Sequence, residues 1–117
     1  MIGWSDIKML QKQKNDLQIQ LDEFLNSDNK DINILNQLKS KLLILDTCVK
    51  KILSLSEVEL KQNEKNKKGY FELKDKTKKI SKIKIASEKM LETVELYMAQ
   101  NNIIPAEHVQ KNANKVL

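Results

Sequence analysis

The sequence of 117 residues has no arginine, one cysteine, one proline and two glycines, and only 4% of its residues are aromatic. Tight β-hairpins depend on glycine and proline in their turns, so this scarcity argues against a sheet-rich fold. The lone Cys48 excludes an internal disulfide and is typical of a reducing compartment. There is no run of 18 apolar residues to span a membrane, and the first residues do not resemble a secretory signal. We therefore expect a cytoplasmic protein.

The same absences limit the chemistry that this chain can perform. The two glycines lie far apart, so no glycine-rich phosphate-binding loop is present. His108 is the only histidine, which leaves too few residues for a histidine-based metal site or for histidine-driven nucleophilic catalysis. Glu88, Glu92 and Glu95 share one helix face and could hold a cation, although such faces usually pair with lysines. We expect a non-enzymatic protein with no catalytic residues, no cofactor and no metal ion.

What the sequence does contain is a heptad-like alternation of hydrophobic residues. Three segments, 5–26, 31–61 and 70–100, carry apolar residues at alternating spacings of three and four, which is typical of helices that pack at shallow angles. The second and third segments are equally long, about 46 Å each as helices. The apolar positions are Ile7, Leu10, Leu17, Leu21 and Phe24; then Leu35, Leu38, Leu42, Leu45, Val49 and Ile52; then Leu73, Ile80, Ile83, Met90, Val94 and Tyr97.

A polar stretch from Lys61 to Lys68, followed by Gly69, separates the two long segments and predicts a turn between antiparallel helices. Pro105 suits the first turn of a short fourth helix over 105–116. The expected fold is all-α: an elongated antiparallel three-helix bundle, or coiled-coil hairpin, with a short C-terminal fourth helix. We expect the whole chain, 1–117, to form one domain.

Local features add further expectations. Ser5 can cap the first helix, and Trp4 can pack onto Met9 as a hydrophobic staple. Trp4 could alternatively anchor a partner, because tryptophan is enriched in interface hot spots. Cys48 falls on the apolar stripe of the second helix, where a small buried side chain is expected.

Three polar residues, Lys14, Lys76 and Ser87, occupy positions of the apolar seams. Polar residues at such positions reduce packing and can fix register or oligomeric state. Self-association that completes the core of a marginal bundle is therefore one possibility, and these three residues would limit its alignments.

Charge is the strongest functional signal in the sequence. Residues 61–84 hold ten lysines against three acidic residues, whereas the rest of the chain is close to neutral. Lys74, Lys78 and Lys82 lie four apart on one helix face, and Lys61, Lys65 and Lys68 form a second row across the proposed turn. Both rows end at the tip of the hairpin, so we expect the ten lysines of this segment to gather there and attract an acidic partner. AT-rich codon usage is an alternative explanation for lysine in place of arginine. The candidate partner-binding residues are Lys61, Lys65, Lys67, Lys68, Lys74, Lys78 and Lys82.

These features favour a non-enzymatic helical protein–protein interaction module, an adaptor or accessory subunit of a larger assembly. We expect residual apolar surface to bind another helical protein and the lysines to dock on an acidic surface. A second hypothesis is an electrostatic binder of nucleic acid or anionic membrane. The absence of arginine weakens sequence-specific nucleic-acid recognition, since lysine lacks the bidentate fork that reads bases.

Two resemblances offer a third hypothesis. A short helix followed by a long helical hairpin resembles the regulatory three-helix domains of membrane-fusion syntaxins. The stretch 21–28 (LDEFLNSD) with 34–39 (ILNQLK) is similar to bacterial flagellar export chaperones. They imply a vesicle-fusion regulatory domain or an export chaperone, and we transfer no site residue from either.

Overall fold

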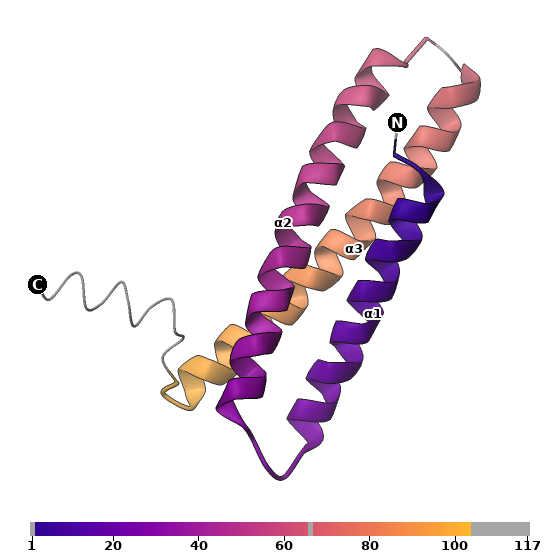
Figure 1. Cartoon of the computed structure of the whole chain (residues 1–117). Helices are drawn as coiled ribbons and strands as arrows, with labels where there is room; N and C mark the ends of the chain where they lie inside the picture. The colour runs from indigo at the N-terminus through magenta and orange to yellow at the C-terminus, as the bar shows by residue number, and fades with distance from the viewer. Residues whose placement is uncertain (1, 66, 104–117) are drawn as a thin grey trace, which may run out of the picture.

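The computed structural model describes residues 2–65 and 67–103 and contains three long helices (Figure 1). They are α1 (Trp4–Asn26), α2 (Ile32–Gln62) and α3 (Lys67–Gln100). The described residues are 87% helical and contain no strand. The predicted all-α bundle is therefore confirmed. The fourth helix predicted over 105–116 lies outside the described residues.

The helix boundaries agree with the sequence pattern except at the start of α3. Helix α3 begins at Lys67, three residues before the expected position, so Gly69 lies inside the helix and not in the turn. Glycine costs a helix only about 1 kcal/mol relative to alanine, and the lysines beside it are good helix formers. The connection between α2 and α3 is accordingly short, as is usual between antiparallel helices.

The N-terminal caps explain where α1 and α2 begin. Gly3, with an extended backbone, caps α1, and its N–H donates to the Asp6 carboxylate at 3.2 Å. The expected cap, Ser5, lies within the first turn instead. Asp31 caps α2 by accepting a hydrogen bond from the Asn33 N–H at 2.9 Å. Side-chain oxygens at these positions satisfy backbone N–H groups that have no partner within the helix.

The hydrophobic core lies where the three predicted apolar seams pack against one another. Leu35, Leu42 and Leu73 are completely buried. Lys76 and Ser87, the polar seam positions of α3, are also buried, at 4% and 0% exposure. The fully or nearly fully buried apolar residues are Ile7, Leu10, Leu17, Leu21, Phe24, Leu35, Leu38, Leu42, Leu45, Val49, Leu53, Leu73, Ile80, Ile83, Met90, Leu91, Val94 and Met98.

The bundle is elongated, with a radius of gyration of 17.7 Å and extents of 54 × 37 × 19 Å. A compact domain of this length would have a radius of gyration of about 13 Å. Helices α2 and α3 form a long antiparallel hairpin, and α1 packs along one side of it (Figure 1). Because α1 is shorter, the tip of the hairpin extends beyond the N-terminal end of α1 (Figure 1).

Helix α2 leaves part of its apolar surface exposed. Cys48 is exposed, so the expectation that it is buried is wrong. The buried positions around it are Leu45 and Val49, and the helical rotation turns Cys48 away from them toward the outer side of α2. Other large apolar side chains exposed on this helix are Ile32, Ile34, Leu43, Ile44, Leu55 and Val58.

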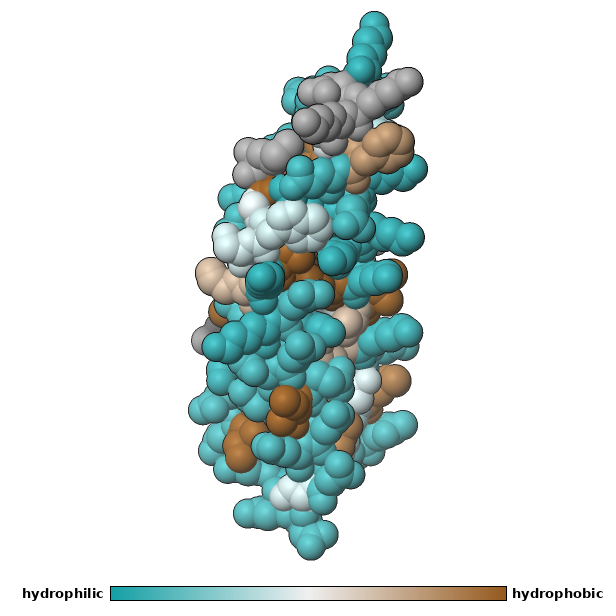
Figure 2. Space-filling model, turned by 90° about the vertical axis from the view of Figure 1, so that its right-hand side faces the viewer, coloured by the Kyte–Doolittle hydropathy of each residue, from teal (hydrophilic) through white to brown (hydrophobic). Residues whose placement is uncertain are grey.

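Helix α1 also exposes some apolar side chains, among them Met9 and Ile19. Figure 2 shows the side of the bundle where α1 lies as mainly hydrophilic, with several small hydrophobic areas. Isolated apolar side chains are ordinary on protein surfaces and do not form an interface by themselves.

Candidate interaction surface

Three of the predicted lysines, Lys74, Lys78 and Lys82, form an exposed row on α3. They follow one another at four-residue intervals and therefore span about 12 Å of the helix. Neither Lys78 nor Lys82 forms an ion pair or hydrogen bond with another described residue, and Lys74 makes only a 6.0 Å contact with the ring of Tyr70. The row therefore presents three uncompensated positive charges.

The lysine row borders a groove between α2 and α3 with a volume of about 440 Å³. Leu53 and Leu60 of α2 supply apolar surface, and Thr77 and Ser81 supply hydroxyls. Glu57 is the one acidic residue in the lining. The side chains that line the groove are Leu53, Glu57, Leu60, Lys74, Thr77, Lys78, Ser81 and Lys82. We call this feature the lysine groove.

The groove lies on the side of the hairpin that faces away from α1. Helix α1 approaches α3 at Glu72, Lys76 and Lys79, through contacts to Trp4 and Ile2. Glu72 and Lys76 lie about 200° around the helix from Lys74 and Lys78, respectively, because each residue turns the helix by about 100°. No described helix covers the groove, so it is open to a partner.

The remaining predicted lysines belong to the tip of the hairpin, where α2 ends and α3 begins. Lys61 is at the exposed end of α2 and Lys65 is exposed in the turn that follows. Lys67 and Lys68 lie in the first turn of α3, and their side chains are outside the description. The ten lysines of residues 61–84 do not all gather at the hairpin tip, because six of them follow α3 away from the tip as far as Lys84.

Three of those ten lysines are engaged within the chain. Lys76 is buried, donates to the Ile2 carbonyl oxygen at 3.0 Å and lies 3.6 Å from a Glu72 carboxylate oxygen. Lys79 lies 4.9 Å from the centroid of the Trp4 ring, and Lys84 forms a 3.9 Å ion pair with Glu88. These side chains stabilise the bundle, which leaves the charge of the lysine groove to Lys74, Lys78 and Lys82.

Trp4 contacts α3. Its indole N–H donates to a Glu72 carboxylate oxygen at 3.1 Å, and the amino groups of Lys76 and Lys79 lie 5.4 and 4.9 Å from the centroid of its ring. The predicted staple onto Met9 is wrong, because Trp4 is the first residue of the helix and Met9 is 57% exposed. Cation–π contacts of this kind contribute about 0.5–1 kcal/mol at exposed sites. Trp4 thus joins the N-terminus to α3, and a role as partner anchor stays a prediction.

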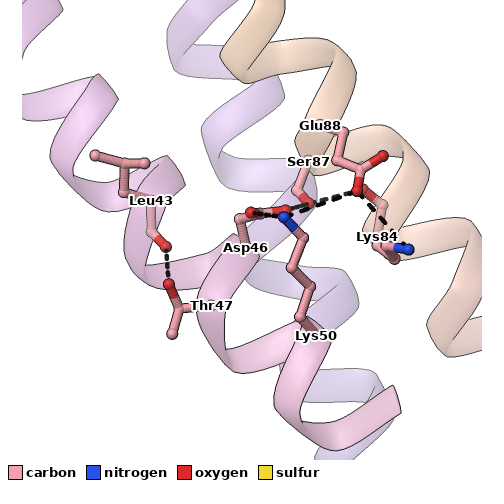
Figure 3. Close-up of polar contacts among 7 residues, drawn as sticks. All are labelled: Leu43, Asp46, Thr47, Lys50, Lys84, Ser87 and Glu88. Atoms are coloured by element: carbon pink, nitrogen blue, oxygen red, sulfur yellow. Dashed lines mark hydrogen bonds and ion pairs between the residues drawn. The ribbon is translucent and has the colours of Figure 1, made fainter. Parts of the chain in front are cut away.

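A second polar cluster lies within the α2–α3 interface and is shown in Figure 3. The Ser87 hydroxyl donates to one Asp46 carboxylate oxygen at 3.2 Å and also lies 2.8 Å from the carbonyl oxygen of Lys84. The other Asp46 carboxylate oxygen accepts from Lys50 at 2.8 Å. Lys50 also approaches Glu88 at 3.9 Å. The cluster satisfies a carboxylate that is only 8% exposed.

The electrostatics of this cluster affect Lys50. The hydrogen bond and negative charge of Asp46, with a smaller contribution from Glu88, raise the pKa of Lys50 above its ordinary value of 10.5. A hydrogen bond to the charged form stabilises that form, and an adjacent opposite charge does the same. Because Ser87 is completely buried and its hydroxyl is committed to these contacts, we interpret the cluster as a structural link between α2 and α3.

The described residues meet neither the requirements of a metal site built from clustered side chains nor those of a membrane-spanning helix. Within residues 2–65 and 67–103, no three histidine, cysteine, aspartate or glutamate side chains converge as metal ligands would. Nor does any helix there combine the length and the apolar character that crossing a bilayer requires. What the lysine groove can do is bind: three ammonium groups attract anions, and the adjacent leucines favour an apolar side chain.

Comparison with known proteins assigns no family. No protein-family model matches the chain, and no curated protein or solved structure is similar to it.

Reasoning from the sequence missed the α2 side of the groove and the buried partner of Ser87. Leu53, Glu57 and Leu60 are far from Lys78 in the sequence and meet it only after the hairpin closes. Asp46 carried a weak signal, because it lies four residues after Leu42 and three before Val49 and so shares their helix face.

Proposed function

We propose that this chain is a non-enzymatic interaction module whose lysine groove binds an acidic helical segment of another protein, as an adaptor or accessory subunit of a larger assembly would. The observation that carries the proposal is the alignment of Lys74, Lys78 and Lys82, free of ion pairs with other described residues, along an open groove with leucines in its lining. An amphipathic helix presents carboxylates and apolar side chains at the same four-residue spacing.

The composition of the groove favours a protein over a nucleic acid or a membrane. Its positive charge is a single row, and leucines of α2 lie across the groove from it. A nucleic-acid backbone is usually contacted by broader basic surfaces that include arginine, which this chain lacks. A membrane-binding helix needs an extended apolar face that dips into the bilayer.

The test measures binding of a labelled helical peptide with glutamates at every fourth position beside a row of leucines. We expect the wild-type chain to bind it, with an association rate that falls as salt rises. Reversing Lys74, Lys78 and Lys82 to glutamate should weaken binding by at least about tenfold, because three favourable pairs become repulsive. The fold should persist, since all three side chains are exposed.

The matched control changes the same amount of charge elsewhere. Lys8 and Lys12 on α1 and Lys51 on α2 are exposed and do not line the groove, so their reversal to glutamate should leave peptide affinity nearly unchanged. Equal loss in both triple variants would mean that only net charge matters, and the groove would lose its role. Binding of a DNA duplex or of phosphatidylserine vesicles through Lys74, Lys78 and Lys82, without binding of the peptide, would favour the alternative function.

A further inference from the structure

Helix α3 has an outward face whose two halves carry opposite charge. This face follows the same alternation of three and four residues as the buried seam, but on the other side of the helix. Its N-terminal half contains the lysine row, and its C-terminal half contains acidic residues, with Ile85 between them at 49% exposure. The outward face consists of Phe71, Lys74, Lys78, Ser81, Lys82, Ile85, Glu88, Glu92, Glu95 and Ala99.

The charges on this face of α3 are complementary to those on the same face of a second, antiparallel copy. If α3 is laid antiparallel against a second copy with Ile85 opposite Ile85, then Lys78 lies opposite Glu92 and Lys82 lies opposite Glu88 of the second copy. The twofold symmetry of such a contact repeats each pair, because residue i contacts j and j contacts i. A parallel alignment would instead place lysine against lysine and glutamate against glutamate.

The groups needed for this contact are accessible. Glu92 and Glu95 are exposed and form no ion pair with another described residue, like Lys78 and Lys82. Glu88 has two long ion pairs within the chain, each of 3.9 Å, which leave its side chain 45% exposed. The apolar side chains of Phe71 and Leu96, 66% and 53% exposed, lie toward the two ends of the same helix.

We propose that a second copy of this chain occupies the outward face of α3, forming an antiparallel dimer centred on Ile85. The inference rests on the proposed function, since it identifies the acidic helix that the lysine row accepts as the C-terminal half of α3. Exposed ion pairs select orientation more than they add affinity, so the dimer forms reversibly and weakens as salt rises. Dimerisation and binding of another acidic helix then compete for the same lysines.

Charge reversal at a single symmetric pair gives the sharpest test. Sedimentation equilibrium over a range of concentrations should show a reversible dimer for the wild type at low salt. Lys78→Glu alone, or Glu92→Lys alone, should raise the dissociation constant by about tenfold or more, because each change turns two attractive pairs into repulsive ones. Combining both changes in one chain restores opposite charges across the interface, and dimerisation should return.

Mixing the two single variants provides an independent measurement. A Lys78→Glu chain and a Glu92→Lys chain are complementary at both symmetric pairs, so a heterodimer should form where neither variant dimerises alone. Lys51→Glu on α2 changes the same charge outside the interface and should leave the dissociation constant unchanged. Circular dichroism of each variant checks that the fold is retained.

Two results would overturn the proposal. One is a wild-type chain that stays monomeric at the highest concentration at low salt. The other is a dimer whose dissociation constant does not respond to the Lys78 and Glu92 changes. In either case, binding of the acidic peptide through the lysine groove is measured separately, so failure of the dimer and failure of the proposed function are distinguishable.

Discussion

Removing the Ser87 hydroxyl should destabilise the bundle only while Asp46 is present. In the wild type the hydroxyl donates to a carboxylate oxygen of Asp46 across the α2–α3 interface, at 3.2 Å and out of contact with solvent (Figure 3). Hydrogen bonds to charged groups contribute about 1.5–3 kcal/mol to stability. The length of this bond places Ser87→Ala near the lower end, at about 1.5 kcal/mol.

In a chain that already carries Asp46→Ala, the Ser87→Ala change should lose most of its destabilising effect. Without the carboxylate, the Ser87 hydroxyl still has the Lys84 carbonyl oxygen at 2.8 Å, a contact within its own helix. Alanine is a better helix former than serine, which offsets part of the loss of this local bond. We expect Ser87→Ala to cost less than about 0.5 kcal/mol in this background, so the coupling energy between the two positions is about 1–1.5 kcal/mol.

The free energy of unfolding of the wild type, the two single variants and the double variant is measured by urea denaturation, followed by circular dichroism and by Trp4 fluorescence. A loss of 1.5 kcal/mol should also lower the melting temperature by about 6 °C in a domain of this size. Thr47→Ala serves as the control, because the Thr47 hydroxyl is exposed and donates within its own helix to the Leu43 carbonyl oxygen at 2.9 Å. If Ser87→Ala costs the same with and without Asp46, the interface bond contributes nothing and the reasoning fails.

Two further predictions concern the core and its charges. Leu42→Ala should lower the free energy of unfolding by about 2–5 kcal/mol, because Leu42 is completely buried. Leu43→Ala, at the neighbouring position that is 38% exposed, should lower it by less than about 1 kcal/mol. Similar values for the two variants would show that the faces of α2 are wrongly assigned. Because Asp46 raises the pKa of Lys50, the stability due to this contact is present below the ordinary pKa and is lost as pH rises through the higher folded-state value. Stability measured against pH should therefore fall less steeply in alkali for Lys50→Met than for the wild type, and superimposable slopes would argue against the contact.

The helical elements follow from the sequence because they depend on local order. Alternating spacings of three and four place residues such as Leu35, Leu42 and Ile80 on one face of each helix, whatever the helix then packs against. The scarcity of glycine and proline leaves few other places for the chain to turn. The same periodicity identified Lys76 and Ser87 as polar members of the seam, although not the groups that they contact.

Two predictions from the sequence, for Cys48 and for Trp4, were wrong because local spacing does not show which other helix a side chain will meet. Cys48 was expected to be buried because it falls on the apolar stripe of α2, but it is exposed while Leu45 and Val49 beside it are buried. Trp4 was expected to contact its own helix at Met9. Its long side chain instead reaches Glu72 of α3, 68 positions away, which local spacing cannot indicate.

The sequence by itself determined three amphipathic helices, a hairpin between the second and third, and an excess of lysine around the turn. Only the tertiary structure decided which lysines are free: Lys76 is buried against the N-terminus and Lys79 lies on Trp4, whereas Lys78 borders an open groove. The physical reason is that helix formation depends on neighbours within a turn or two along the chain. A groove, a buried ion pair or a free charge depends on which helices meet and how far each one is rotated.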